Sequence, residues 1–441
     1  MTGARGERQL IRVRVSNVSR AGEETTLPDY SADTGRIARW LPVRRHHALL
    51  AGWTVLWFVL VARSGGVSWH YLRQGEQLLF GSGKGGGLSL YADHPELQIG
   101  PFSLAVARIF APFPPATGQL LAEATMAALG LVMLILVGRT AAVHYLGTGT
   151  NHRRLQQRIL VAGLAFIPMW IEVTVRFAHL DDALTLFCTT LAVHALARGR
   201  TWAVAVFLAL AVDAKPWAVP FAVLLLALPV GRRRGPFLLF CALVAVAWLP
   251  FYLGNLDTMA AAKFAIPNQP ASSLRWLGVN APDTPFWDRP VQFALGAALG
   301  ALAVLRGRWP AVVLLCVDAR ILLDPSVYTY YSASVLLGTL LWDAVGARRL
   351  VPWWSWIALL SLYGGTLVIP SDATRGLVRL AFVVVSALYV LFWPTPGKRV
   401  RNRRRARTRS ARTTGSVGSG STNSAAARTP DLVGPRVDAA W

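Results

Sequence analysis

The sequence has few charged residues and few cysteines, and both shortages restrict what the protein can be. Only 15% of its 441 residues are charged, whereas 54% are hydrophobic. With a mean hydropathy of +0.42, nearly all of its apolar runs are expected to lie in lipid. The three cysteines stand apart inside apolar runs without CxxC spacing, so neither a disulfide framework nor a zinc site is indicated. We therefore predict a polytopic membrane protein.

Acidic residues are also scarce, and 22 Asp and Glu against 45 Lys and Arg leave a net charge of +23. In a soluble protein this balance would suggest a nucleic-acid partner. Here the basic residues collect at the ends of apolar runs and in the tails, where they set the orientation of membrane helices. We therefore expect contacts with membrane lipids and none with nucleic acid.

The chain lacks a small-residue cleavage site after its first apolar run, so that run is expected to stay as an anchor. Residues 1–46 are polar and basic and are predicted to form a disordered cytoplasmic segment. Residues 47–395 form the predicted membrane domain. Residues 396–441 are rich in Arg, Ser, Thr, Gly and Ala, which predicts a basic, disordered cytoplasmic tail.

The apolar runs predict an all-α bundle of about 10–12 membrane segments with extracytoplasmic loops. Arginines alternate between the runs in a way that places both termini in the cytoplasm of a plasma-membrane protein. The outer face then receives residues 64–116, 176–181, 253–290, 324–330 and 370–375. The runs themselves cover 47–63, 117–138, 159–175, 182–197, 202–230, 236–252, 291–305, 310–323, 331–346, 352–369 and 376–393.

The run 202–230 begins and ends beside cytoplasmic arginines, yet two full crossings need about 40 residues. We interpret it as a broken hairpin with its tip at residues 213–217, because Pro216 removes a backbone donor and disfavours helix before it. Such a tip is tolerated only where protein or water surrounds it. The alternative is one long helix kinked at Pro216.

The first outer loop carries Asp93, His94 and Glu96 shortly before a helix that is predicted to start at Gly100 and Pro101. Residues 101–111 are too short to span the bilayer and are predicted to form an interfacial or re-entrant helix. Either carboxylate could act as a general base at a partly buried edge. The alternative is an acidic cap that complements the helix dipole. The glycine-rich stretch 81–87 lacks phosphate-loop spacing and is interpreted as a flexible loop.

A second acidic cluster, His179, Asp181 and Asp182, lies in a short turn between two apolar runs. Adjacent carboxylates there need a positive partner. Candidates are Arg176, Lys215, a substrate cation or a divalent metal held by Asp181 and Asp182. Asp182 could instead simply cap the next helix.

Lys215 is the only lysine inside an apolar run. A buried ammonium needs a counter-charge, which a lipid phosphate could supply; the alternative is an internal pair with Asp213. A further polar set lies at an outer helix end, where tyrosines are also expected as an interfacial belt; it comprises Arg320, Asp324, Tyr328, Tyr330 and Tyr331.

Three features resemble one family: His179-Leu-Asp-Asp-Ala-Leu184, Ala214-Lys-Pro-Trp217 and the acidic first outer loop. Over about residues 47–345 the chain resembles multi-pass GT-C glycosyltransferases, especially the polyprenyl-phosphate-mannose-dependent α-1,2-mannosyltransferases of actinobacteria. The resemblance implies a GT-C-like fold and a polyprenyl-phosphate sugar donor. It also implies a base at Asp93 or Glu96, two carboxylates competing for one role.

From these features we expect transfer of a sugar, mannose being one candidate, to a glycan or glycolipid acceptor at the outer face. Asp93 or Glu96 is expected to be catalytic. No cofactor other than a candidate divalent metal is expected. The rivals are a transporter or lipid flippase, which would also have broken helices but should show internal repeats, and a membrane scaffold. The residues expected to bind substrate are His94, His179, Asp181, Asp182, Lys215, Arg320 and Tyr328.

Overall fold

A computed structural model describes residues 43–81, 85–145, 152–347 and 351–393. Most of the predicted N-terminal segment, the whole predicted tail 396–441 and part of the glycine-rich loop therefore lie outside the described residues. The chain divides at Arg45, and the residues from His46 onward form one compact unit. Within the described ranges this unit consists of helices and their connections, without a β-strand, which confirms the all-α prediction.

Within the described ranges, six helices are both long and apolar enough to cross a membrane. The others are shorter or, like the 18-residue helix Asp288–Leu305, less apolar, so the predicted 10–12 segments are not all full-length apolar helices. The long ones are α1 (Val43–Ala62), α5 (Pro115–His144), α6 (His152–Ile171, extended by a π-helical turn to Arg176), α7 (Leu180–Ala197), α9 (Arg234–Gly254) and α17 (Asp372–Phe392).

The remaining helices complete the bundle and its connections. Those in the bundle are α8 (Thr201–Ala214), α12 (Asp288–Leu305), α13 (Val312–Leu323), α14 (Tyr331–Leu341), α15 (Trp353–Ala358) and α16 (Gly365–Val368). Those in the connections are α2 (Trp69–Phe80), α3 (Leu90–Asp93), α4 (Pro101–Ala107), α10 (Met259–Ala262) and α11 (Ser273–Trp276).

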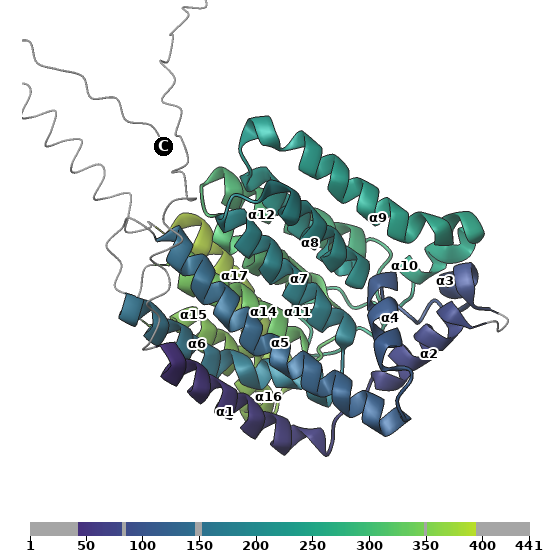
Figure 1. The fold of residues 1–441 in the computed structure, drawn as a ribbon, viewed down its shortest axis with the longest axis horizontal. Coiled ribbons are helices and arrows are strands. Elements are labelled where there is room, and N and C mark those ends of the chain that lie inside the picture. The colour runs from purple at the N-terminus through teal and green to yellow at the C-terminus, as the bar shows by residue number, and fades with distance from the viewer. Residues whose placement is uncertain (1–42, 82–84, 146–151, 348–350, 394–441) are drawn as a thin grey trace, which may run out of the picture. The chain divides into compact units, whose positions relative to one another are not determined.

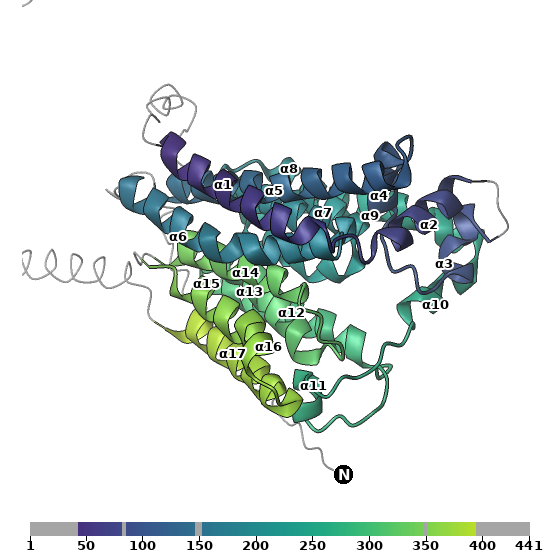
Figure 2. The same ribbon diagram turned by 90° about the horizontal axis from the view of Figure 1, so that it is seen from below.

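The helices pack in layers. α5, α7, α8 and α9 follow one another side by side (Figure 1). Figure 2 shows α12, α13 and α14 beneath them, with α15 and α17 beneath those in turn. α6 and α7 are mostly buried, whereas only 11% of the apolar window of α1 and of α9 is buried. A helix that exposes apolar side chains on this scale is suited to contact with lipid.

The run 202–230 is a broken hairpin, and the single kinked helix is wrong. α8 ends at Ala214, and residues Pro216–Ala227 form a 3₁₀ helix. The chain has returned to the start of α8 by Gly235, which packs against the Trp202 ring. A 3₁₀ helix rises about 2.0 Å per residue against 1.5 Å in an α-helix. Its 12 residues therefore span a length similar to that of the 14 residues of α8.

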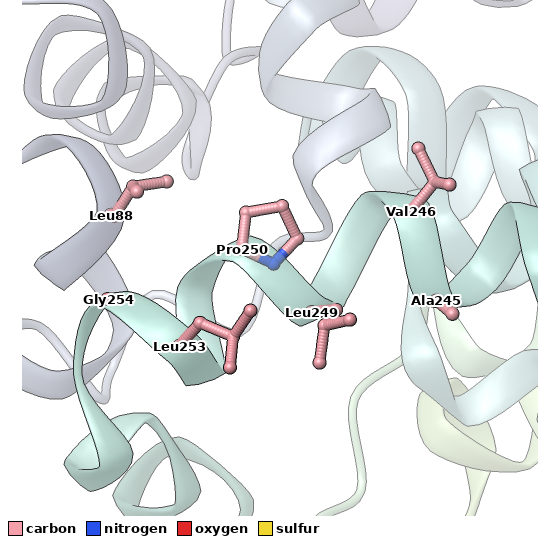
Figure 3. A pocket seen from close by; sticks show the side chains of 7 residues that line it. All are labelled: Leu88, Ala245, Val246, Leu249, Pro250, Leu253 and Gly254. Atoms are coloured by element: carbon pink, nitrogen blue, oxygen red, sulfur yellow. The ribbon is translucent and has the colours of Figure 1, made fainter.

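The outward face of α9 forms an open apolar groove with Leu88. Figure 3 shows Val246, Leu249, Pro250 and Leu253 along this side of the helix, with Leu88 opposite. The other face of α9 is occupied, because the rings of Trp248 and Phe251 lie 5.2 and 4.9 Å from that of Tyr91. The chain between α1 and α5, which contains Tyr91, is the first connection. α9 thus holds this first connection to the bundle.

Candidate functional site

The turn before α7 has an unusual backbone. Glu172–Arg176 is a π-helical turn, and Ala178 has a φ of 50°, a left-handed conformation that costs a non-glycine residue free energy. It is the one positive-φ residue other than glycine within the described ranges. π-turns and strained residues are frequent at functional sites. Ala178 directs the chain so that His179 and the carboxylates after it stand at the start of α7.

Asp181 and Asp182 are buried, with 2% and 4% of their surface exposed. The Lys215 ammonium lies 2.7 Å from an oxygen of Asp181 and 2.6 Å from one of Asp182. His179 Nδ1 lies 3.4 Å from Asp181. The Trp217 indole donates to the second oxygen of Asp182 at 2.9 Å. The hairpin tip therefore supplies the positive partner that these carboxylates were predicted to need.

These contacts decide between the alternatives for Asp182 and Lys215. Asp182 does not cap α7, because the N-cap residue of that helix is His179 and the oxygens of Asp182 accept from Lys215 and Trp217. Lys215 pairs with Asp181 and Asp182 and not with Asp213, whose carboxyl group interacts with the Trp248 side chain through a hydrogen bond. Since Lys215 already has two carboxylate counter-charges, it has little need of a phosphate as a third.

A metal could in principle use the same cluster. Ligand atoms of His179, Asp181 and Asp182 lie within 4.8 Å of one another, and imidazole and carboxylates are ordinary ligands of divalent metals. The ammonium of Lys215 already contacts both carboxylates. A cation would have to displace Lys215 or share these oxygens with it, so the donor set present fits a divalent metal poorly.

Arg320 extends the cluster toward the start of α14. Its guanidinium lies between two aromatic rings, 4.3 Å from the centroid of Trp217 and 4.4 Å from that of Tyr331, an arrangement that stabilises a cation. Its Nε lies 3.5 Å from Asp324. The Tyr330 ring lies 4.3 Å from the His179 ring and stacks on Tyr328 at 5.4 Å. Arg320 and Tyr328 thus belong to the same cluster as His179.

The first connection docks on the hairpin tip through its backbone. The Gly100 amide donates to the Ala214 carbonyl at 3.0 Å, and the Ser103 hydroxyl donates to the same oxygen at 3.1 Å. A Cβ on Gly100 would overlap the carbonyl oxygens of Asp213 and Ala214. Only glycine allows this approach. The predicted acidic loop is therefore joined, through Gly100, to the residue that precedes Lys215.

Asp93 and Glu96 differ from the prediction in their surroundings. Both side chains are exposed, so the prediction that these carboxylates lie at a partly buried edge is wrong. His94 Nδ1 lies 3.3 Å from Glu96. The capping interpretation is also wrong, because α4 has neither an acidic residue in its first turn nor a side-chain cap at Gly100. The two carboxylates have no capping role at this helix.

Several buried or partly buried polar residues were not predicted as site residues. Trp217, in the motif Ala214-Lys-Pro-Trp217, is partly buried and donates to Asp182. Arg379 lies inside the apolar run 376–393 and is only 5% exposed. Asp288, at the start of α12, is 0% exposed. A charged residue within an apolar run was a usable signal for Arg379, because such residues are rare in membrane helices and face the bundle interior.

Each residue predicted to bind substrate thus has a definite place. His179, Asp181, Asp182, Lys215, Arg320 and Tyr328 form one contiguous cluster, and His94 lies with Glu96 on the first connection. The two groups are linked through Gly100 and Ala214. No protein-family model, no curated protein and no solved structure matches the chain.

Proposed function

We propose that the protein is a membrane glycosyltransferase that transfers a sugar from a polyprenyl-phosphate donor to a glycan or glycolipid acceptor. The observation that carries the proposal is the cluster of the buried Asp181 and Asp182 with the partly buried Lys215 and Trp217, built where a broken hairpin meets the first connection. Buried charges at such a break are costly and mark a functional site more often than a structural one. The predicted topology places this cluster at the outer face of the plasma membrane.

In this proposal the exposed loop carboxylates act on the acceptor. Asp93 or Glu96 takes the proton from the attacking hydroxyl, which gives inverted stereochemistry at the transferred sugar in a single displacement. The contact between His94 Nδ1 and Glu96 at 3.3 Å orients the second of these carboxylates. An exposed carboxylate can reach an acceptor that arrives from solvent, and closure over the substrates excludes water from the reacting atoms.

The buried cluster acts on the donor sugar. Asp181 and Asp182 accept hydrogen bonds from sugar hydroxyls, while Lys215 keeps both carboxylates charged in a dry site. Arg320, held rigidly between two aromatic rings, provides a fixed positive charge for the departing phosphate. Fixed charges of this kind need no reorganisation during the reaction.

The test uses full-length protein purified into lipid nanodiscs and a panel of labelled polyprenyl-phosphate sugars. We expect transfer to an acceptor, with turnover reduced about 10²- to 10⁴-fold in Asp93→Asn or Glu96→Gln and the donor KM little changed. Asp257→Asn is the matched control, because Asp257 is also exposed and its 3₁₀ turn packs against α3.

Absence of transfer from every donor would overturn the proposal. Movement of the labelled lipid across the bilayer without transfer would instead favour the flippase. Equal, small losses of turnover in Asp93→Asn, Glu96→Gln and Asp257→Asn would show that neither Asp93 nor Glu96 is catalytic.

A further inference from the structure

A buried arginine with unpaired N–H donors lies beside the cluster. Arg379 on α17 is only 5% exposed, and within the described ranges its Nε and Nη2 atoms have no hydrogen-bond partner. A guanidinium stays charged and carries five N–H donors. A buried donor that makes no hydrogen bond costs free energy, more so when it is charged. Such a side chain calls for a partner with several oxygen acceptors.

The packing of α13 and α17 places Arg379 level with the end of α13, beside Arg320 and Asp324. The helices run antiparallel, because Arg308, just before α13, donates to the carbonyl of Trp393 beyond the end of α17 at 2.7 Å. Farther along, Ser386 donates to Asp318 at 2.8 Å. Arg379 lies two turns before Ser386, about 10 Å along the helix. That distance brings Arg379 to the end of α13, where Arg320 and Asp324 stand.

Positive charge is in excess at this place. Burial raises the pKa of Asp324, and the charges of Arg320, Arg379 and Arg289 oppose that rise. Three guanidinium groups therefore act on the Asp324 carboxylate. Two further carboxyls among the described residues lie near them: Asp182, which acts on Arg320 but is already paired with Lys215, and Asp288, whose pKa is raised to about 7 by burial and by the charge of Asp324. Asp288 therefore offsets only part of the positive charge at neutral pH.

The other two arginines already have partners. Arg289 donates to the carbonyls of Ala262 at 2.8 Å and of Phe264 at 2.5 Å. Arg320 contacts Asp324 and two aromatic rings. Of the three, only Arg379 has buried N–H donors that lack a hydrogen-bond partner within the described ranges.

We propose that Arg379 and Arg320 form an oxyanion site for a phosphoryl group, carried either by a lipid or by free phosphate. The planar guanidinium fork matches phosphate oxygens and makes two parallel hydrogen bonds to them. Lys215, in contrast, is already shared by two carboxylates. The inference deepens the proposed function and rests on it only for identifying the anion as the phosphate of the donor.

Direct binding tests the site without requiring sugar transfer. Full-length protein in phosphatidylcholine nanodiscs is titrated with inorganic phosphate, with dodecyl phosphate, and with dodecanol as the uncharged control. We expect saturable binding of one or both phosphates and none of dodecanol. Preference for dodecyl phosphate identifies a lipid source, and equal affinities identify free phosphate.

The variant Arg379→Gln should bind the phosphate about tenfold to a hundredfold more weakly, because it loses charge-assisted hydrogen bonds. Arg379→Lys should retain part of the affinity. Arg375→Gln is the matched control: it lies one turn away on α17 and is already bonded to Asp372 and to the carbonyls of Ile369 and Thr366. Unchanged affinity in Arg379→Gln, or equal losses in it and the control, would overturn the site.

Thermal unfolding without any anion separates binding from a structural role. If Arg379 is kept for a ligand, Arg379→Gln should be at least as stable as the wild type, since it removes a buried charge whose Nε and Nη2 make no hydrogen bond. A large loss of stability would make the arginine structural and would overturn the proposal. Phosphate binding without sugar transfer from any donor leaves the site standing while the proposed function fails. Sugar transfer with an unchanged donor KM in Arg379→Gln would leave the proposed function standing while the phosphate site at Arg379 fails.

Discussion

At Lys215 one ammonium group is shared by two carboxylates, 2.7 Å from Asp181 and 2.6 Å from Asp182. The three side chains come from two elements, α7 and the tip that follows α8. A buried ion group of this kind adds little stability compared with apolar packing, but removal of one partner leaves uncompensated charge. Lys215 therefore matters more for what it neutralises than for its own contacts.

We predict that Lys215→Met lowers the free energy of unfolding by about 3–5 kcal/mol, because Asp181 and Asp182 lose their cation while still buried. Denaturation of the purified protein in detergent measures this. Lys263→Met, which removes an exposed lysine, should change stability by less than about 0.5 kcal/mol. Losses of similar size in the two variants would show that Asp181 and Asp182 do not depend on Lys215.

A second residue-scale prediction concerns pH. Burial, together with the charge of Asp324, raises the pKa of Asp288 to about 7. The folded protein therefore holds a proton that the unfolded chain releases near pH 4. Stability should fall as pH rises from about 4 through 7. Asp288→Asn, which keeps a neutral side chain, should raise the melting temperature at pH 8 and change it little at pH 4.

The control for this prediction is Asp283→Asn, at an exposed carboxylate in the same connection. It should leave the melting temperature nearly unchanged at both values of pH. A stabilisation of Asp288→Asn that is the same at pH 4 and pH 8 would contradict the raised pKa.

At the scale of elements, the first connection is held to the hairpin tip mainly by a backbone contact. Gly100 touches the carbonyls of Asp213 and Ala214, and no side chain larger than hydrogen fits there. Because the acidic loop lies directly before Gly100, the position of Asp93 and Glu96 depends on this contact.

We predict that Gly100→Ala separates the first connection from the tip and speeds hydrogen exchange of the amides at 97–104 by about tenfold or more, equivalent to about 1.4 kcal/mol. Mass spectrometry of the exchanged protein measures it. Gly231→Ala is the control, since a Cβ there meets no atom within 4 Å. Protection at 97–104 that is as strong in Gly100→Ala as in the control would mean that the loop is held elsewhere.

Some of these elements could be predicted, for physical reasons that are specific to each. The broken hairpin followed from arginine placement and from Pro216, which are local signals. The helix start at Pro101 was predicted and is confirmed by α4. The partner of Lys215 could not be predicted from the sequence. The choice between Asp213 and the α7 carboxylates depends on how two helices pack side by side. The exposure of Asp93 and Glu96 depends on the same tertiary packing, and there the prediction was wrong.

At the scale of the whole molecule, the sequence predicts the class of fold better than it predicts the site. Hydropathy identifies apolar helices because lipid and protein interior both select apolar residues. It does not tell a full crossing from a short buried helix, and hence six long helices accompany several shorter ones. Arg379 shows the same limit, since its place beside Arg320 follows only from the antiparallel packing of α13 and α17.

The predicted topology can be tested by cysteine labelling in intact cells. In a chain whose exposed Cys241 is replaced by Ser, we expect a cysteine at Lys263 to react with an impermeant thiol reagent in intact cells. A cysteine at Gly231 should react only after the membrane is opened. Both positions are exposed in the folded chain. The reverse pattern would place the cluster on the cytoplasmic side and remove the proposed outer-face reaction.

The pairing of Lys215 with Asp181 and Asp182 also bears on how the chain is inserted during synthesis. A charged side chain at the centre of a membrane helix costs about 2.5–3.5 kcal/mol on insertion scales, and less near an end. α7 alone would carry two unbalanced carboxylates into the bilayer boundary, and α8 would expose a lone ammonium. Only Arg198, Gly199 and Arg200 separate these helices. We therefore expect α7 and α8 to leave the translocation machinery together, as one electrically compensated pair.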